Sequence, residues 1–459
     1  MRYFLLLLVF ATTLFAQTSL PDTPAGKRAA AFLEMANSSG DDALKKFILE
    51  NMTPNPDLAL DKRVERFRGI RDDMAGAKLV QVLNADAEGI TFSLTNNRGE
   101  AFRMQLELGE EDKIGGIRVD ALGDGGGAQK PQTARVPESQ FLAAVEKYLA
   151  DIVREDKFSG TVLIAKGGKP VFVKAFGMAS KEKKLANRID TKYNLGSINK
   201  VFTMLAVGML ADEGKLSLDD KLGKILPDYP NADAREKVTI RHLLAMTSGV
   251  GDFFGPEYDA MPKAKLRNNS DFIPLFSQKP LLFEPGKGRR YSNGGYVLLG
   301  AIIEKISGKS YYDFVRTRIF IPIGMPNTES YFSDAKTLNL AMGYTREIDA
   351  KKWSPNTTTR PARGSSAGGG YSTAQDLLKF ANAIDGKTFK VPAALLSVQD
   401  PMVGGMFQGG LGFAGGAPGI NSMIDSALPG GYTVIVLSNY DPPAAESVSE
   451  HIRALLGAN

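Results

Sequence analysis

Cysteine is absent from this chain of 459 residues, and histidine occurs only twice. Without cysteine there are no disulfides, no cysteine nucleophile, no thiolate metal ligands and no lipidated cysteine. The two histidines, His242 and His451, also exclude a zinc site built from several histidines. A Ser-His-Asp triad would have to use His242, whose neighbours Leu243, Leu244 and Met246 favour a packed structural helix.

A strong excess of charge of one sign is also missing. The formal net charge is +5, and the basic residues are scattered among acidic ones. This pattern favours neither nucleic acid nor a polybasic membrane contact. We therefore expect a small molecule or a neutral polymer as the partner.

The first residues, "MRYFLLLLVFATTLFAQTSL", place one arginine before about a dozen apolar residues, with a small residue at Ala16. This pattern predicts a secretory signal over residues 1–16, because the run is too short to span a bilayer with its flanks. No other stretch has enough length and hydrophobicity to span. We expect no stable membrane anchor after cleavage and a periplasmic or secreted location in a bacterium.

Residues 21–122 predict a small α+β domain with helices first and strands afterwards. The element order resembles that of the NTF2-like cone fold. A linker is predicted over residues 123–137, because "ALGDGGGAQKPQTARVP" combines glycine, proline and polar residues without periodicity. The expected helices cover 25–37, 41–52 and 60–74, and the expected strands cover 77–86, 89–96, 100–109 and 114–120.

Residues 138–459 predict a second domain of the α/β (α+β) class. An amphipathic helix over 138–156 precedes a hairpin over 160–177, whose turn is Gly-Gly-Lys-Pro. Strands return over 420–428 and 432–440, and a last helix follows. Strands at both ends with helices between them predict one antiparallel sheet covered by helices, with an inserted helical subdomain.

Serine is followed by lysine three positions later at several places in the chain. On a helix this spacing puts both side chains on one face, about 5–6 Å apart at Cβ, so that a neutral amine can take the hydroxyl proton. Only the pair in "NLGSINKVFTML" follows a glycine and opens an apolar run, which would desolvate the lysine and lower its pKa. This stretch alone is equally compatible with a serine that caps the helix. The three pairs are Ser180/Lys183, Ser197/Lys200 and Ser333/Lys336.

A third polar group is needed to pass a proton to the leaving group. Tyr291 and Asn293 lie on a glycine-bounded turn directly before an amphipathic helix. The phenol could relay a proton, and the amide could hold Lys200 by a hydrogen bond. The alternative for Tyr291 is an ordinary turn tyrosine. A second Tyr-x-Asn begins at Tyr229, but its central residue is a proline in a polar loop.

A G-x-S-x-G pattern occurs at Gly364, Ser366 and Gly368. A nucleophile elbow needs a buried strand before the serine and a helix starting at it. Here "TTRPAR" precedes the pattern, and the next helix is expected only after Ser372. We therefore interpret it as a coincidence of spacing.

From about residue 141 to 456 the chain resembles the serine β-lactamase-related family, which includes class C β-lactamases, D-alanyl-D-alanine carboxypeptidases, D-aminopeptidases and related carboxylesterases. The matching stretches occur in the family's order and spacing. They are "GSINK", "LADEGKLSLDDKLGKILPDYP", "VTIRHLLAMTSGV", "EPGKGRRYSNGGYVLLGAIIEKISG", "IFIPIGMPNT", "AGGGYSTAQDLLKFA" and "GGAPGINS". The resemblance implies a β-lactamase/transpeptidase-like sheet flanked by helices.

The resemblance also implies residue roles. Ser197 would be the acylated nucleophile, Lys200 and Tyr291 the base and proton relay, and Asn293 a positioning residue. The oxyanion would be held by the backbone N–H groups of Ser197 and of a residue on the last active-site strand.

That strand departs from the family's pattern, where the third motif is commonly Lys-Thr-Gly or His-x-Gly. Alignment on "GAPGINS" puts the triplet from Phe413 to Gly415 there, with Gly416 supplying the oxyanion N–H. A phenyl ring cannot bind a carboxylate, so recognition of an anionic β-lactam or D-Ala-D-Ala would need Arg360 or Arg363 instead. An uncharged ester or small amide fits an aromatic wall better.

The leading hypothesis is an exported serine hydrolase of ester or amide bonds, closer to an esterase or peptidase than to an efficient β-lactamase, that needs no metal or other cofactor. The rival is a catalytically inactive member of the penicillin-recognising fold that binds a cell-wall peptide or a protein. A regulatory subunit docked through the amino-terminal domain is a third reading. The sequence leaves the oligomeric state and the acyl group open.

Overall fold

The computed structural model describes residues 19–54, 59–87, 89–97, 100–124, 136–333, 339–346, 352–400, 403–408 and 410–458. The predicted signal over residues 1–16 and most of the predicted linker lie outside these ranges. The chain divides into two compact units, Met1–Gln132 and Thr133–Asn459. Within the described ranges, no helix combines the length and the apolar character needed to cross a membrane.

The first unit has three helices followed by a four-stranded antiparallel sheet in the order β1-β2-β3-β4. One face of the sheet packs on the helices, where Phe32 meets Phe47 and Phe92 edge-on at centroid distances of 6.1 and 6.5 Å. The expected α+β arrangement is confirmed, and the likeness to an NTF2-like cone stays a prediction. The elements are α1 (Pro24–Ala36), α2 (Asp41–Asn51), α3 (Leu60–Asp73), β1 (Lys78–Ala85), β2 (Gly89–Thr95), β3 (Glu100–Leu108) and β4 (Ile114–Asp124).

The second unit is built on a five-stranded antiparallel sheet in the order β13-β14-β15-β5-β6. The central pair joins the two ends of this unit, since β15 runs beside β5 from Tyr432 opposite Lys166 to Ser438 opposite Gly160. The predicted sheet, completed by strands from both ends, is confirmed. Its strands are β5 (Gly160–Lys166), β6 (Lys169–Phe176), β13 (Gly412–Ala417), β14 (Ile420–Leu428) and β15 (Tyr432–Ser438).

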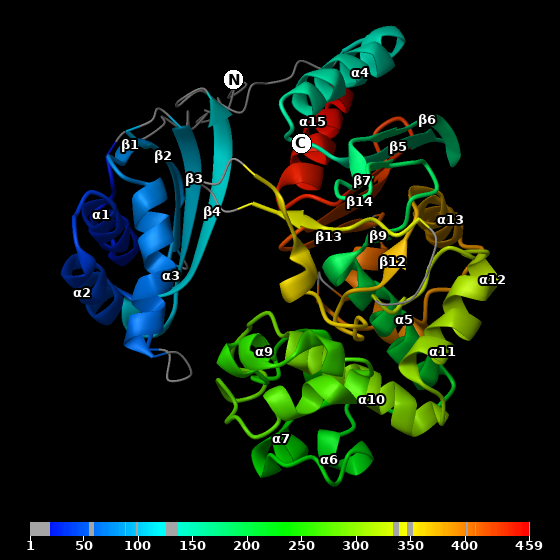
Figure 1. The fold of residues 1–459 in the computed structure, drawn as a ribbon. Coiled ribbons are helices and arrows are strands. Elements are labelled where there is room, and N and C mark those ends of the chain that lie inside the picture. Colours follow the sequence, from blue (N-terminus) through cyan, green and yellow to red (C-terminus); the bar gives the residue numbers. More distant parts are fainter. Residues whose placement is uncertain are drawn as a thin grey trace, which may run out of the picture. The chain divides into compact units, whose positions relative to one another are not determined.

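Helices cover both faces of this sheet (Figure 1). On one face α4 (Glu138–Arg154) and α15 (Ala444–Leu456) bury an apolar layer that includes Phe141, Val448 and Ile452. On the other face lie α13 (Ala374–Asp385) and the helical subdomain.

The other elements of this unit are helices and short strands. Apart from the central helix α5, the helices are α6 (Leu222–Ile225), α7 (Ala232–Lys237), α8 (Ile240–Leu244), α9 (Pro256–Ala260), α10 (Asn293–Ser307), α11 (Tyr311–Val315), α12 (Ile321–Ile323) and α14 (Ala393–Leu396). The short strands are β7 (Met178–Ser180), β8 (Leu185–Ala186), β9 (Tyr193–Asn194), β10 (Tyr344–Thr345), β11 (Ser354–Pro355) and β12 (Tyr371–Ser372).

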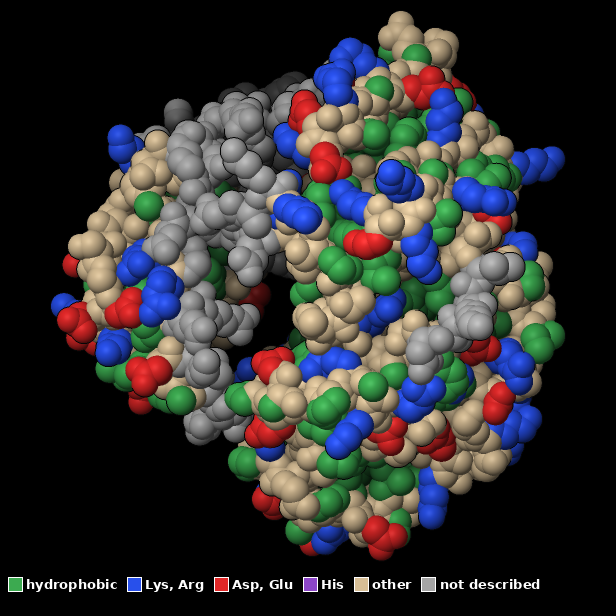
Figure 2. Space-filling view, viewed as in Figure 1, with side chains coloured by type: hydrophobic (Ala, Val, Ile, Leu, Met, Phe, Trp, Pro, Cys, Tyr) green, Lys and Arg blue, Asp and Glu red, His purple; other side chains and the backbone are tan. Residues whose placement is uncertain are grey.

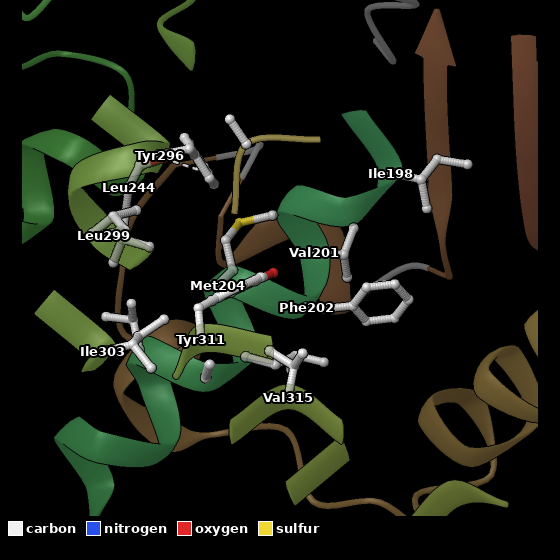
Figure 3. Packing of buried hydrophobic residues seen from close by; sticks show 14 of the residues in the cluster. Ile198, Val201, Phe202, Met204, Leu244, Tyr296, Leu299, Ile303, Tyr311 and Val315 are labelled. Atoms are coloured by element: carbon white, nitrogen blue, oxygen red, sulfur yellow. Dashed lines mark hydrogen bonds between the residues drawn. The ribbon is translucent and has the colours of Figure 1, made fainter. Parts of the chain in front are cut away.

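The helix at the centre of this unit is α5 (Asn199–Asp212), of whose 14 residues all but three are buried. Apolar residues surround it, as expected for a helix enclosed on every side. Figure 3 shows Met204 of α5 on the side toward Tyr296 and Leu299 of α10, and Val201 beside Phe202 on the other side. A polar side chain near the start of α5 is therefore held in an apolar environment.

Candidate active site

Ser197 lies in a 3-10 turn (Gly196–Ile198) that leads directly into α5, rather than in the α-helix itself. Gly196 allows the turn, since its φ is +51° and a Cβ there would lie 3.0 Å from the backbone nitrogen of Gly416. Neither the turn nor α5 has a side-chain cap. Among the described residues, no hydrogen bond therefore supports the capping alternative for Ser197.

Lys200 is 4% exposed, and its Nζ lies within hydrogen-bond distance of three oxygens. The distances are 3.2 Å to Ser197 Oγ, 2.7 Å to Asn293 Oδ1 and 2.5 Å to the carbonyl oxygen of Ala367. Burial lowers the pKa of Lys200 from 10.5 to about 7, and the negative charge of Asp252 opposes this shift. A large fraction of the amine is therefore neutral at physiological pH.

The partners of Lys200 decide where a neutral amine directs its lone pair. An amide oxygen and a peptide carbonyl can only accept hydrogen bonds. The two N–H bonds of the neutral amine are used by Asn293 Oδ1 and the Ala367 carbonyl. The lone pair is left facing the hydroxyl of Ser197, which is the geometry a general base requires.

Tyr291 is a hydrogen-bond donor to the same hydroxyl, whereas neutral Lys200 accepts a hydrogen bond from it. Its OH donates a 2.5 Å hydrogen bond to Ser197 Oγ, and its ring centroid is 4.7 Å from Lys200 Nζ. The residue is 46% exposed as a whole, but burial of its phenol group raises the pKa of Tyr291 to about 12. The phenol thus keeps its proton at neutral pH.

Asn293 is the first residue of α10 and is held by Asp252, a residue that the sequence reasoning missed. Asn293 Nδ2 donates a 2.7 Å hydrogen bond to Asp252 Oδ2, which leaves Oδ1 for Lys200. A second missed contributor is the Ala367 carbonyl. A loop carboxylate and a backbone oxygen have no spacing signature in sequence.

Strand β13 lies against the turn that carries Ser197. A Cβ added at Gly415 would lie 2.0 Å from the carbonyl oxygen of Leu195 and 2.9 Å from the backbone nitrogen of Ser197. Gly416, the next residue, is exposed on the strand. Phe413 is 7% exposed and belongs to the main apolar core, so an aromatic wall for a substrate has to come from other, exposed rings.

The G-x-S-x-G serine is fully buried and serves the structure. Ser366 Oγ is 2.6 Å from Asn269 Oδ1 and 2.7 Å from the carbonyl oxygen of Tyr296. These bonds anchor the loop whose next carbonyl, that of Ala367, reaches Lys200. The motif therefore contributes to the site through its backbone.

The two histidines lie in structural positions. His242 forms a capping box with Thr239, and His451 stacks on Tyr148 at 3.7 Å. Tyr229 is buried, and the asparagine two residues later caps α7.

The other candidate serine–lysine pairs differ from the pair Ser197/Lys200. Lys183 is exposed, and its backbone N–H donates to Ser180 Oγ. Lys336 lies outside the described residues. Among the described pairs, only Ser197/Lys200 has a buried lysine.

The two arginines proposed for carboxylate binding are engaged by other groups. Arg360 donates to the hydroxyl of Tyr371 at 2.9 Å. Arg363 donates to the carbonyl oxygen of Ser330 and lies 3.5 Å from the ring centroid of Tyr312. Neither contact involves the serine–lysine pair.

Fold and site together define an α/β protein with a buried serine–lysine centre at the edge of an antiparallel sheet. The chain belongs to the Beta-lactamase family, whose model matches residues 145–458. The expected family and its fold class are thereby confirmed.

Individual relatives agree with this assignment. A penicillin-binding protein of Bacillus subtilis is 38% identical over 202 residues, which are 43% of this chain and 44% of the relative. The protein flp of Staphylococcus aureus is 34% identical over 186 residues, 40% of this chain and 37% of the relative. The chain thus matches less than half the length of these two relatives.

Solved structures match over more of their length. A penicillin binding protein from Bacillus halodurans is 30% identical, with a TM-score of 0.59, and the match covers 67% of this chain and 99% of that one. A D-amino acid amidase from Ochrobactrum anthropi has a TM-score of 0.59 at 23% identity, covering 70% and 98%, and shows the shared fold.

Proposed function

We propose that this protein is an exported serine hydrolase that cleaves ester or amide bonds through an acyl-enzyme on Ser197. The observation that carries the proposal is the hydrogen-bond pattern of Lys200, whose two obligate acceptors direct the lone pair of the neutral amine to Ser197 Oγ. A buried lysine with its pKa lowered to about 7 is suited to act as a base at neutral pH.

In the proposed acylation, Ser197 Oγ attacks the carbonyl carbon while its proton passes to Lys200 Nζ. The backbone N–H groups of Ser197 and Gly416 face the developing oxyanion. Tyr291, which is still protonated, gives its proton to the leaving atom and regains one from the Lys200 ammonium, so that both side chains end neutral. Deacylation runs these transfers in reverse, with water in place of the leaving group. Water attacks the acyl carbon and gives a proton to Tyr291, Tyr291 gives its own to Lys200, and Lys200 returns one to Ser197 Oγ as the Oγ–acyl bond breaks.

The contacts of the two candidate arginines favour an uncharged substrate. Arg360 and Arg363 are bound to other groups, and acidic and basic side chains are interspersed on the face seen in Figure 2. Among the described residues, two exposed rings belong to the site region: Tyr291, which touches Ser197, and Phe254, which is 51% exposed and donates its backbone N–H to Asp252. We therefore expect a neutral ester or amide with an apolar group, rather than efficient turnover of an anionic β-lactam.

The similar structures support the same range of reactions. They include the D-amino acid amidase and EstCE1, a hydrolase with promiscuous acyltransferase activity, both of which share the fold. The penicillin binding protein from Bacillus halodurans makes penicillin a reasonable acylating probe even if it is a poor substrate.

The test is covalent labelling of the protein by a fluorophosphonate and by a penicillin, followed by intact mass and peptide mapping. We expect one adduct on Ser197, its loss in Ser197→Ala, and its retention in Ser366→Ala, which removes the serine of the G-x-S-x-G pattern. Absence of any adduct on Ser197 in the unmodified protein would overturn the proposal. Ligand binding that persists unchanged in Ser197→Ala, without turnover in either protein, would favour the inactive binding protein.

Export is part of the proposal and is supported by the amino-terminal sequence. Expression of the full chain in a bacterium should yield protein outside the cytoplasm that lacks the first 16 residues, as read from its intact mass. Recovery of the full-length chain in the cytoplasm alone would contradict this part.

A further inference from the structure

Asp252 lies in the loop between α8 and α9, and both of its carboxylate oxygens are used. Oδ2 accepts hydrogen bonds from Asn293 Nδ2 at 2.7 Å and from the Asn293 backbone N–H at 3.2 Å. Oδ1 accepts one from the backbone N–H of Phe254 at 3.0 Å. One carboxylate therefore connects the first turn of α10 to the loop that carries an exposed aromatic ring.

The carboxylate decides which end of the Asn293 amide faces Lys200. An ionised carboxylate can only accept, so the amide NH2 must point to Asp252 and the amide oxygen to Lys200 Nζ, 2.7 Å away. Without Asp252 the amide could rotate and present N–H bonds to the lysine. Lys200 would then lose an acceptor, and its lone pair would no longer be restricted to Ser197.

Asp252 also supplies the negative charge that acts on Lys200. Two tyrosines face the amine as well, with ring centroids 4.7 Å (Tyr291) and 5.5 Å (Tyr296) from Nζ. Burial raises the pKa of both phenols, so they are neutral across the working range. Removal of the carboxylate should therefore destabilise the ammonium form and lower the pH at which Lys200 loses its proton.

The start of the loop, at Gly251, is fixed by contacts that do not involve the Asp252 side chain. Ser292 Oγ donates to the carbonyl oxygen of Gly251 at 3.0 Å and accepts from the backbone N–H of Gly295 at 2.8 Å. Gly294 lies so close that an added Cβ would be 2.4 Å from the Gly251 oxygen. Variants at Asp252 should keep the backbone of this region in place.

We propose that Asp252 is a positioning residue of this centre, whose carboxylate fixes the Asn293 amide and thereby directs the lone pair of Lys200 to Ser197. The inference rests on the proposed hydrolase function. Asp252 acts through Asn293 and need not touch the substrate.

The experiment measures the rate of fluorophosphonate labelling of Ser197 between pH 5 and pH 10 in the full chain, using Asp252→Ala and Asp252→Asn. For Asp252→Ala we expect a maximal rate lower by roughly 10- to 100-fold, by analogy with the loss typical when hydrogen-bond partners that orient metal ligands are removed. In both variants the acid limb of the pH–rate profile, where the labelling rate falls as Lys200 takes up a proton, should move to lower pH. In Asp252→Asn, which retains the shape and one acceptor oxygen, the loss of maximal rate should be smaller.

Asp271→Ala is the matched control, because that carboxylate also accepts two backbone N–H groups, of Arg267 at 2.9 Å and Asn268 at 2.7 Å. It should leave the acid limb in place, since the two backbone groups that Asp271 binds are not among the hydrogen-bond partners of Lys200.

The possible failures are distinguishable. Labelling of both Asp252 variants with the wild-type rate and acid limb would overturn this inference and leave the proposed function intact. A wild-type protein that is not labelled at Ser197 overturns the proposed function and this inference with it. Circular dichroism of each variant shows whether a lost rate reflects unfolding, and Asp252→Asn decides the question if Asp252→Ala does not fold.

Discussion

Replacement of Lys200 by methionine should change the pH dependence of stability more than stability at neutral pH. The pKa of Lys200 is lowered from 10.5 to about 7 by burial. Between these values the unfolded chain binds more protons than the folded one, so the stability of the wild type rises as pH rises through this window. At pH values below the window the buried lysine costs about 5 kcal/mol, and above it this cost disappears.

Replacement by methionine removes this cost, but it also has a second, destabilising effect. Methionine fills similar space without charge, but it leaves Asn293 Oδ1 and the Ala367 carbonyl without the donor they have in the wild type. Each unpartnered acceptor costs about 1–3 kcal/mol. At and below pH 7 the cost of the two acceptors therefore nearly cancels the gain from removing the buried charge. These oxygens do not titrate in this range. Between pH 6 and pH 9 the wild type should therefore gain about 3 kcal/mol relative to Lys200→Met.

Urea unfolding at four pH values from 6 to 9 measures this difference. Trp353 is the only tryptophan of the chain, and it stacks on Tyr440 at 3.8 Å, so its fluorescence reports on the unit that contains Lys200. Lys183→Met, at an exposed lysine, should show no such trend. A wild-type to Lys200→Met difference that stays flat with pH would mean that Lys200 keeps its proton when folded, and would refute its role as base.

Three further variants test other parts of the site. Tyr291→Phe keeps the ring but removes the donor to Ser197 Oγ, so kcat for an activated ester should fall roughly 10²- to 10⁴-fold while the urea midpoint is unchanged; an unchanged kcat would exclude the proton relay. Gly415→Ala places a Cβ 2.0 Å from a backbone oxygen and should slow labelling about 10²-fold, whereas Gly412→Ala, which has 3.8 Å to its nearest neighbour, should not; equal rates would show that β13 does not set the geometry. Phe254→Ala should raise KM roughly tenfold for esters with a large apolar group and leave small esters unaffected; a uniform change would argue against substrate contact at this ring.

Four of the five strands in the sheet of the second unit were predictable because each has a local signature, whereas the glycine-rich strand β13 was located only through the family resemblance. Residues 160–166 alternate or run apolar as a central strand, and the turn after them contains Gly167 and Gly168, whose φ values are +56° and +75°. Glycine adopts this left-handed region without strain, so the pair indicates a hairpin. The pairing of β15 with β5 joins distant parts of the chain, and it followed from the absence of other strong strands between them.

The serine–lysine pair was predictable for a different reason. The spacing occurs at three places, but only at Ser197 does an apolar run follow, and burial of the helix is what lowers the pKa of Lys200. Asp252 was not predictable, because a single aspartate in a loop is the usual pattern of a solvated turn. Its role depends on a contact with Asn293, 41 positions away in the sequence.

The loop that contains the G-x-S-x-G pattern explains how a buried helix can hold a lysine at all. Its carbonyl oxygens at residues 365, 366 and 367 lie against α5, where an unpartnered oxygen would be costly. Three side chains of α5 satisfy them in turn: Asn199 Nδ2 at 3.0 Å, Thr203 Oγ1 at 2.7 Å and Lys200 Nζ at 2.5 Å. Asn199 and Thr203 are one helical turn apart and hold the loop whether or not Lys200 is charged. The third oxygen therefore keeps its place when the lysine loses its proton, and the site retains its geometry across the pH range in which the proposed base would work.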